Sequence, residues 1–146
     1  MAVVAAIITV ALIGPAQLAS AHKGASQEYA ALAAAPENVR LRQNPLVNDL
    51  RTTAAGRKLF AQHCAQCHGK NGEGTDRAPS LLEDEVQNAP PGALFWLLTN
   101  GAVRRGMPVW SKLPEPQRWQ IVSYIQTLKT ETHPVAQKAT GVGQPQ

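Results

Sequence analysis

The pattern of apolar and polar residues predicts three helices between residues 52 and 129. Thr52 or Thr53 can cap the first helix, which runs through Leu59 and Phe60 toward residue 64. A loop follows, because three glycines lie within residues 69–74 and would penalise a helix. The last helix, from about residue 115 to 129, has apolar residues spaced i, i+3, i+4 and i+7: Ile121, Tyr124, Ile125 and Leu128.

The middle helix is apolar on almost every side. It follows Pro90-Pro91, extends from Gly92 to Asn100 and ends at Gly101, where a glycine with positive φ is favoured. Such a helix must be buried all round or must cover a large apolar object. The chain shows little strand patterning, so we expect an all-α module over residues 52–129. A core of this size is marginal without a stabilising cofactor.

The remaining residues divide into three segments. Residues 1–21 are predicted to be a signal peptide cleaved before His22, with an uncleaved anchor as the alternative, because Ala2 to Ile13 are almost wholly apolar and Ala19-Ser20-Ala21 supplies a small-residue cleavage pattern. Residues 22–51 are predicted to be an N-terminal extension or linker. Residues 130–146 lack periodicity and are predicted to be a flexible C-terminal tail. Export would place the protein in the periplasm.

Both cysteines of the chain lie in the pentapeptide Cys64-Ala65-Gln66-Cys67-His68. This Cys-X-X-Cys-His pattern is typical of covalent haem c attachment, in which each thiol bonds one vinyl group and the histidine binds the iron. A single pattern predicts one haem. A redox dithiol would normally begin a helix in a strand-alternating fold. Structural zinc needs four ligands, and no second Cys or His cluster exists. A Cys64–Cys67 disulfide would close too small a loop to stabilise much.

Met107 is the candidate for the second iron ligand. It is the single methionine besides Met1 and lies between Gly106 and Pro108, in a loop between two predicted helices. We expect Gly106 to let the backbone approach closely and Pro108 to stiffen the turn. A methionine is often core filler, which is the alternative interpretation.

Residues 52–129 resemble the class I cytochromes c of the small bacterial monohaem type. The matching residues are Gly56, Phe60, Cys64, Cys67, His68, Ala78-Pro79-Ser80-Leu81, Gly106-Met107-Pro108 and Tyr124. The resemblance implies three to five helices and loops wrapped around one covalently bound haem, with His68 and Met107 as axial ligands. It also implies that Gly56 and Phe60 pack against Tyr124. The carbonyl of Pro79 would accept a hydrogen bond from His68, although an ordinary turn proline is the alternative.

These observations predict a periplasmic one-electron carrier between redox proteins rather than an enzyme. Residues 94–96, 100–101 and 118–119 resemble cytochromes associated with periplasmic dehydrogenases and respiratory oxidases. The alternative function is therefore a haem subunit or tethered domain of a membrane-associated dehydrogenase or oxidase complex. A haem peroxidase or gas sensor would need an open iron site, against which Met107 argues. The resemblance implies no catalytic residue.

The net charge of +4 at pH 7 arises from 14 Lys and Arg against 10 Asp and Glu. So modest an excess suggests a patch that steers an acidic redox partner, not binding to nucleic acid. Arg104 and Arg105, next to Met107, are the candidate docking residues; an ordinary solvated surface is the alternative. Contact with a membrane is expected only if the N-terminal segment stays uncleaved.

Overall fold

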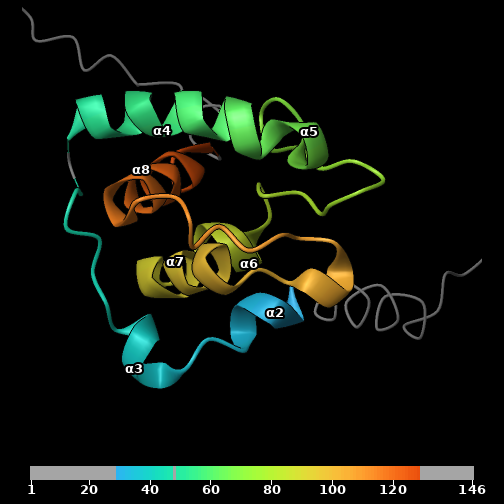
Figure 1. The fold of residues 1–146 in the computed structure, drawn as a ribbon, viewed down its shortest axis with the longest axis horizontal. Coiled ribbons are helices and arrows are strands. Elements are labelled where there is room, and N and C mark those ends of the chain that lie inside the picture. Colours follow the sequence, from blue (N-terminus) through green and yellow to red (C-terminus); the bar gives the residue numbers. More distant parts are fainter. Residues whose placement is uncertain (1–28, 48, 129–146) are drawn as a thin grey trace, which may run out of the picture.

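The computed structural model describes residues 29–47 and 49–128. Its three longest helices are α4 (Leu50–His63), α7 (Pro91–Asn100) and α8 (Glu115–Ile125). Figure 1 shows α4 across one side of the molecule, α8 beneath it and α7 beyond α8. No strand lies within the described residues apart from an isolated bridge between Ala102 and Met107, which confirms the all-α fold class.

Four further helices of the described residues are single turns of four residues: α2 (Ala30–Ala33), α3 (Glu37–Arg40), α5 (Ala65–His68) and α6 (Asp84–Gln87). A short 3₁₀ helix, η1, spans Val103–Arg105. Five of these α-helices, α4 to α8, lie within residues 49–128, which agrees with the three to five expected for the module. The single-turn helices were not predicted one by one, because one turn is too short to produce a hydrophobic period. The predicted signal peptide and C-terminal tail lie outside the described residues.

Helix α4 begins earlier than predicted. Its first residue is Leu50, and the side chain of Asp49 caps it by accepting the backbone N–H of Arg51 at 2.9 Å. Thr52 is buried inside the first turn and does not cap the helix, so the predicted cap was wrong. A carboxylate accepts such a bond at least as well as a hydroxyl, and its negative charge also suits a helix N-terminus.

Helices α4 and α8 cross at a glycine. A Cβ added to Gly56 would overlap the backbone carbonyl of Gln120 and lie 3.0 Å from the Tyr124 Cβ. Beside this close approach, the rings of Phe60 and Tyr124 pack edge to face with centroids 5.3 Å apart. The packing of Gly56 and Phe60 against Tyr124 is therefore confirmed.

The other two long helices end close to the predicted positions. Helix α7 has Pro91 at its start and Gly101, with φ of 68°, directly after its end. Helix α8 stops at Ile125, four residues before the predicted end, because the Thr127 hydroxyl and N–H both bond the Tyr124 carbonyl in a tighter turn. The apolar residues predicted for this helix are all buried: Ile121, Tyr124 and Ile125 within α8, and Leu128 after its end.

Residues 29–47 pack on the helical body, although a linker or extension was expected there. Tyr29, Leu32 and Ala35 are buried among the core side chains. Helix α3 lies against α7 so closely that a Cβ on Gly92 would overlap the Val39 carbonyl. The Asn44 amide donates to the Trp119 carbonyl at 3.3 Å and to the Ser123 hydroxyl at 2.8 Å. This segment therefore forms part of the folded unit.

Candidate functional site

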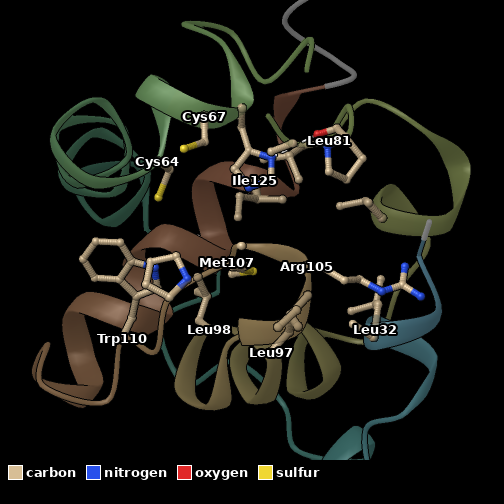
Figure 2. A pocket seen from close by; sticks show the side chains of 18 of the residues that line it. Leu32, Cys64, Cys67, Leu81, Leu97, Leu98, Arg105, Met107, Trp110 and Ile125 are labelled. Carbon is tan, nitrogen blue, oxygen red and sulfur yellow. Dashed lines mark hydrogen bonds between the residues drawn. The ribbon is translucent and has the colours of Figure 1, made fainter. Parts of the chain in front are cut away.

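The site is a cavity of about 300 Å³ with mostly apolar walls. Figure 2 shows the sulfur atoms of Cys64 and Cys67 directed into it from one side and Met107 lying on another. His68 also lines it. The structure thus brings together at one cavity the two thiols, the imidazole and the thioether that the sequence singled out. Pro79 is the fifth predicted site residue and lines the same cavity.

The two thiols and His68 are presented by the junction of α4 and α5. Cys64 directly follows α4 and caps it, with its N–H bonded to the Phe60 carbonyl at 2.8 Å, and its own carbonyl accepts the N–H groups of Cys67 and His68. One tight helical turn therefore directs all three side chains toward the cavity. Leucines of α7 form another part of the wall: Leu94, Leu97 and Leu98.

The His68 ring is oriented by the backbone of the loop after α5. Its Nδ1 lies 3.0 Å from the carbonyl oxygen of Pro79, so the contact implied by the resemblance is present. As the donor to a carbonyl, Nδ1 carries the proton, which leaves Nε2 as the nitrogen able to bind a metal. Burial lowers the pKa of His68, and the bond to Pro79 only partly opposes that shift, so the imidazole is neutral at pH 7.

Met107 is held by a short hairpin. The N–H of Ala102 donates to the Met107 carbonyl at 3.0 Å, and the N–H of Met107 donates to the Ala102 carbonyl at 3.3 Å. Gly106 turns the chain with φ of 88° and lines the cavity, where a Cβ on it would meet no atom of the described residues, so the close approach expected there stays a prediction. Within the hairpin the tight contact is at Gly101, where a Cβ would lie 2.7 Å from the Pro108 carbonyl oxygen.

The geometry weakens the alternative interpretations of the two cysteines. Neither is in a disulfide. Burial raises the pKa of the Cys64 thiol to about 12, with the nearby Cys67 adding to the effect. A thiol with a raised pKa stays protonated at pH 7, so Cys64 is a poor thiolate nucleophile. Among the described residues, no group of three or more His, Cys, Asp and Glu side chains could hold a metal ion.

Several cavity residues were not anticipated from the sequence. Tyr29 and Leu32 reach the cavity from the N-terminal segment, and no motif marks either residue. His63 and Trp110 also line it, with ring centroids 5.1 Å apart. Of the two predicted docking arginines, Arg105 lines the cavity and Arg104 lies exposed beside it. Arg77 lines the cavity from the loop before Pro79.

Comparison with known proteins agrees with this arrangement. Residues 51–125, just over half of the chain, match the family described as cytochrome c oxidase, cbb3-type, subunit III. The chain belongs to this family. Membership confirms the resemblance to small c-type cytochromes and makes the module a haem electron-transfer domain of respiratory-chain type.

A curated relative is the cbb3-type cytochrome c oxidase subunit CcoP of Rubrivivax gelatinosus. It is 27% identical over 90 residues, which cover 60% of this chain and 30% of CcoP. The chain therefore matches less than a third of that relative's length. Within the part of the chain that the structure describes, no helix is both long and apolar enough to cross a membrane.

Proposed function

We propose that this chain binds one haem c in the cavity and passes single electrons through it as a component of a respiratory oxidase complex. The observation that carries the proposal is the cavity itself. The thiols of Cys64 and Cys67, the imidazole of His68 and the thioether of Met107 all line its largely apolar wall, and the imidazole is bonded through Nδ1. The donor set fits haem c, which needs two thioether bonds and two axial ligands.

Four residues would hold the cofactor. Cys64 and Cys67 would each add across one vinyl group, the sulfur bonding to carbon and the thiol proton passing to the neighbouring carbon. This addition consumes no oxidant. His68 would bind the iron through Nε2 and Met107 through its sulfur. The Pro79 carbonyl would fix the imidazole tautomer and raise its basicity as a ligand.

Bound haem c supplies a one-electron couple between ferric and ferrous iron. With His68 and Met107 both bound to it, the iron would have no position open to a substrate. Thioether sulfur favours the ferrous state, so a Met107 ligand would raise the reduction potential. The apolar wall formed by Leu94, Leu97 and Leu98 keeps water from one side of the cavity, which also disfavours the more highly charged ferric state.

The comparisons favour the subunit of a complex over the free carrier. The matched family and CcoP are both described as parts of a cbb3-type oxidase. We therefore place the working site on the periplasmic side of the membrane, with a redox protein as donor and the oxidase as acceptor. The exposed Arg104 beside the cavity suits an acidic surface on such a partner.

Two measurements test this function. Intact-mass analysis of the protein, exported in a host that attaches haem c, should show one haem, and the double variant Cys64→Ala, Cys67→Ala should show none. A mass without haem would contradict the cofactor. Affinity purification from membranes should retain oxidase subunits at stoichiometric amounts; a holoprotein found alone in the periplasmic fraction would favour the free carrier.

A further inference from the structure

Residues 29–47 lie outside the family-matched region, yet they are fastened to it at several points. The Arg42 guanidinium forms an ion pair with Glu115 at 2.8 Å, and Asn44 bonds the Trp119 carbonyl and the Ser123 hydroxyl of α8. Gly92 allows the backbone of α3 to touch α7. The segment is therefore held in one place against the module rather than trailing from it (Figure 1).

The beginning of this segment forms part of the cavity wall. Tyr29 and Leu32 are 9% and 6% exposed, and both line the cavity together with Met107 and Pro79. Figure 2 shows Leu32 on the side of the cavity away from Cys64. Residues that precede the family-matched region thus line the same cavity as Met107 and Pro79.

Tyr29 also makes a specific polar contact there. Its hydroxyl donates to the backbone carbonyl of Ser80 at 2.8 Å, across 51 residues of sequence. Ser80 directly follows Pro79, whose carbonyl lies 3.0 Å from the Nδ1 of His68. The hydroxyl of Tyr29 is therefore one peptide unit away from the carbonyl that orients the imidazole.

The peptide between Pro79 and Ser80 is held on another side by Gly74. A Cβ on Gly74 would lie 2.6 Å from the Ser80 nitrogen and 3.0 Å from the Pro79 carbonyl carbon. Gly74 is itself tied to α5, because its N–H donates to the His68 carbonyl at 2.7 Å. Gly74 therefore restrains this peptide from the loop after α5. The hydrogen bond from Tyr29 restrains the same turn from the N-terminal segment.

We propose that Tyr29 is a positioning residue for the axial histidine: by holding the Ser80 carbonyl it fixes the Pro79 carbonyl on His68 Nδ1. This inference rests on the proposed haem-binding function. A strong bond from Nδ1 makes the imidazole a more basic ligand, which favours ferric iron. Loosening the Pro79 carbonyl should weaken that bond, so the reduction potential should rise.

The test is the Tyr29→Phe variant of the full-length holoprotein, which keeps the ring in the wall and removes only the hydroxyl. Thr127→Val is the matched control, because it removes a hydroxyl-to-carbonyl bond, to Tyr124, at a residue that does not line the cavity. Redox titration gives the midpoint potential, and NMR gives the rate at which the His68 Nδ1 proton exchanges with solvent.

We expect Tyr29→Phe to raise the potential and speed the exchange, whereas Thr127→Val changes neither, even if both variants lose stability. An unchanged or lowered potential in Tyr29→Phe, or an equal shift in the control, would overturn the positioning role. A wild-type protein that carries no covalent haem would instead overturn the proposed function, so the two failures are distinguishable.

Discussion

The Nη2 of Arg42 lies 2.8 Å from the Oε1 of Glu115, which joins the N-terminal segment to the first residue of α8. The same guanidinium lies over two stacked rings, 4.9 Å from the centroid of Phe95 and 5.4 Å from that of Trp119. Trp119 in turn donates its indole N–H to Glu115 at 3.3 Å. One cation therefore links three parts of the fold through an ion pair and ring contacts.

Glu115 should make stability depend on pH. The hydrogen bond from Trp119 and the ion pair with Arg42 lower the pKa of Glu115 below its usual value of 4.5. A carboxyl with a lowered pKa in the folded state stabilises the fold above its unfolded-state pKa and loses that contribution as pH falls through the folded-state pKa. Glu115→Gln should therefore unfold at lower urea concentration than wild type at pH 7, and the difference should shrink as pH falls below 4.5.

Glu83→Gln is the control for this comparison, since Glu83 is exposed and no ion pair of it is found within the described residues. Its unfolding midpoint should match wild type at both pH values. If Glu115→Gln lost as much stability at pH 3 as at pH 7, the carboxylate would not be the source of the effect.

The crossing of α4 and α8 should tolerate no side chain at Gly56. The methyl group of Gly56→Ala would overlap the Gln120 carbonyl, so the helices would have to separate. Overpacking of this kind costs about 1–3 kcal/mol and occasionally more. Ala54→Ser, at an exposed position of α4, should change stability by less than about 0.5 kcal/mol. Chemical denaturation of both holoproteins measures the difference; equal stability in the two would show that the helices adjust without cost.

The sequence predicted the parts of the fold that depend on local pattern. The apolar spacing of α8 and the Pro91 and Gly101 boundaries of α7 each follow from residues close together in the chain. The cap at Asp49 was missed because two threonines nearby offered the same chemistry. The packing of residues 29–47 was missed because it depends on Gly92 and α8, which lie far away in sequence.

For the site, the motif around Cys64 and the isolated Met107 identified residues that the fold brings to one cavity. Their roles as haem attachment points and iron ligands stay predictions. The contribution of Tyr29 was not visible, because a tyrosine in an alanine-rich stretch carries no motif and its partner is a backbone carbonyl. Contacts to the backbone depend on where a loop runs, not on which residue occupies it.

Arg104 should speed association with an acidic partner. It is exposed next to the Met107 hairpin, where an attractive charge would act near the proposed haem edge. Arg104→Glu should slow electron transfer to an acidic redox protein at low ionic strength and flatten the dependence of the rate on salt. Lys58→Glu, on the exposed side of α4 and not among the cavity residues, is the charge-matched control. Equal electron-transfer rates for the two variants in stopped-flow measurements would show that Arg104 is an ordinary solvated residue with no role in docking.

Met107→Ala should open the iron to external ligands. Without the thioether sulfur, the ferrous state loses a favourable ligand and the reduction potential falls. The variant should then bind carbon monoxide or cyanide, whereas wild type should bind them weakly. Val109→Ala, at an exposed residue of the same loop, should leave potential and ligand binding unchanged. An unchanged potential in Met107→Ala would show that Met107 is not an iron ligand.

The near-infrared absorption spectrum of the ferric holoprotein distinguishes a six-coordinate iron held by His68 and Met107 from an iron with an open sixth position. We predict the weak charge-transfer band of methionine-ligated ferric haem in wild type and its loss in Met107→Ala. A wild-type spectrum without that band would show that Met107 does not bind the iron and that the sixth position is open or held by another group.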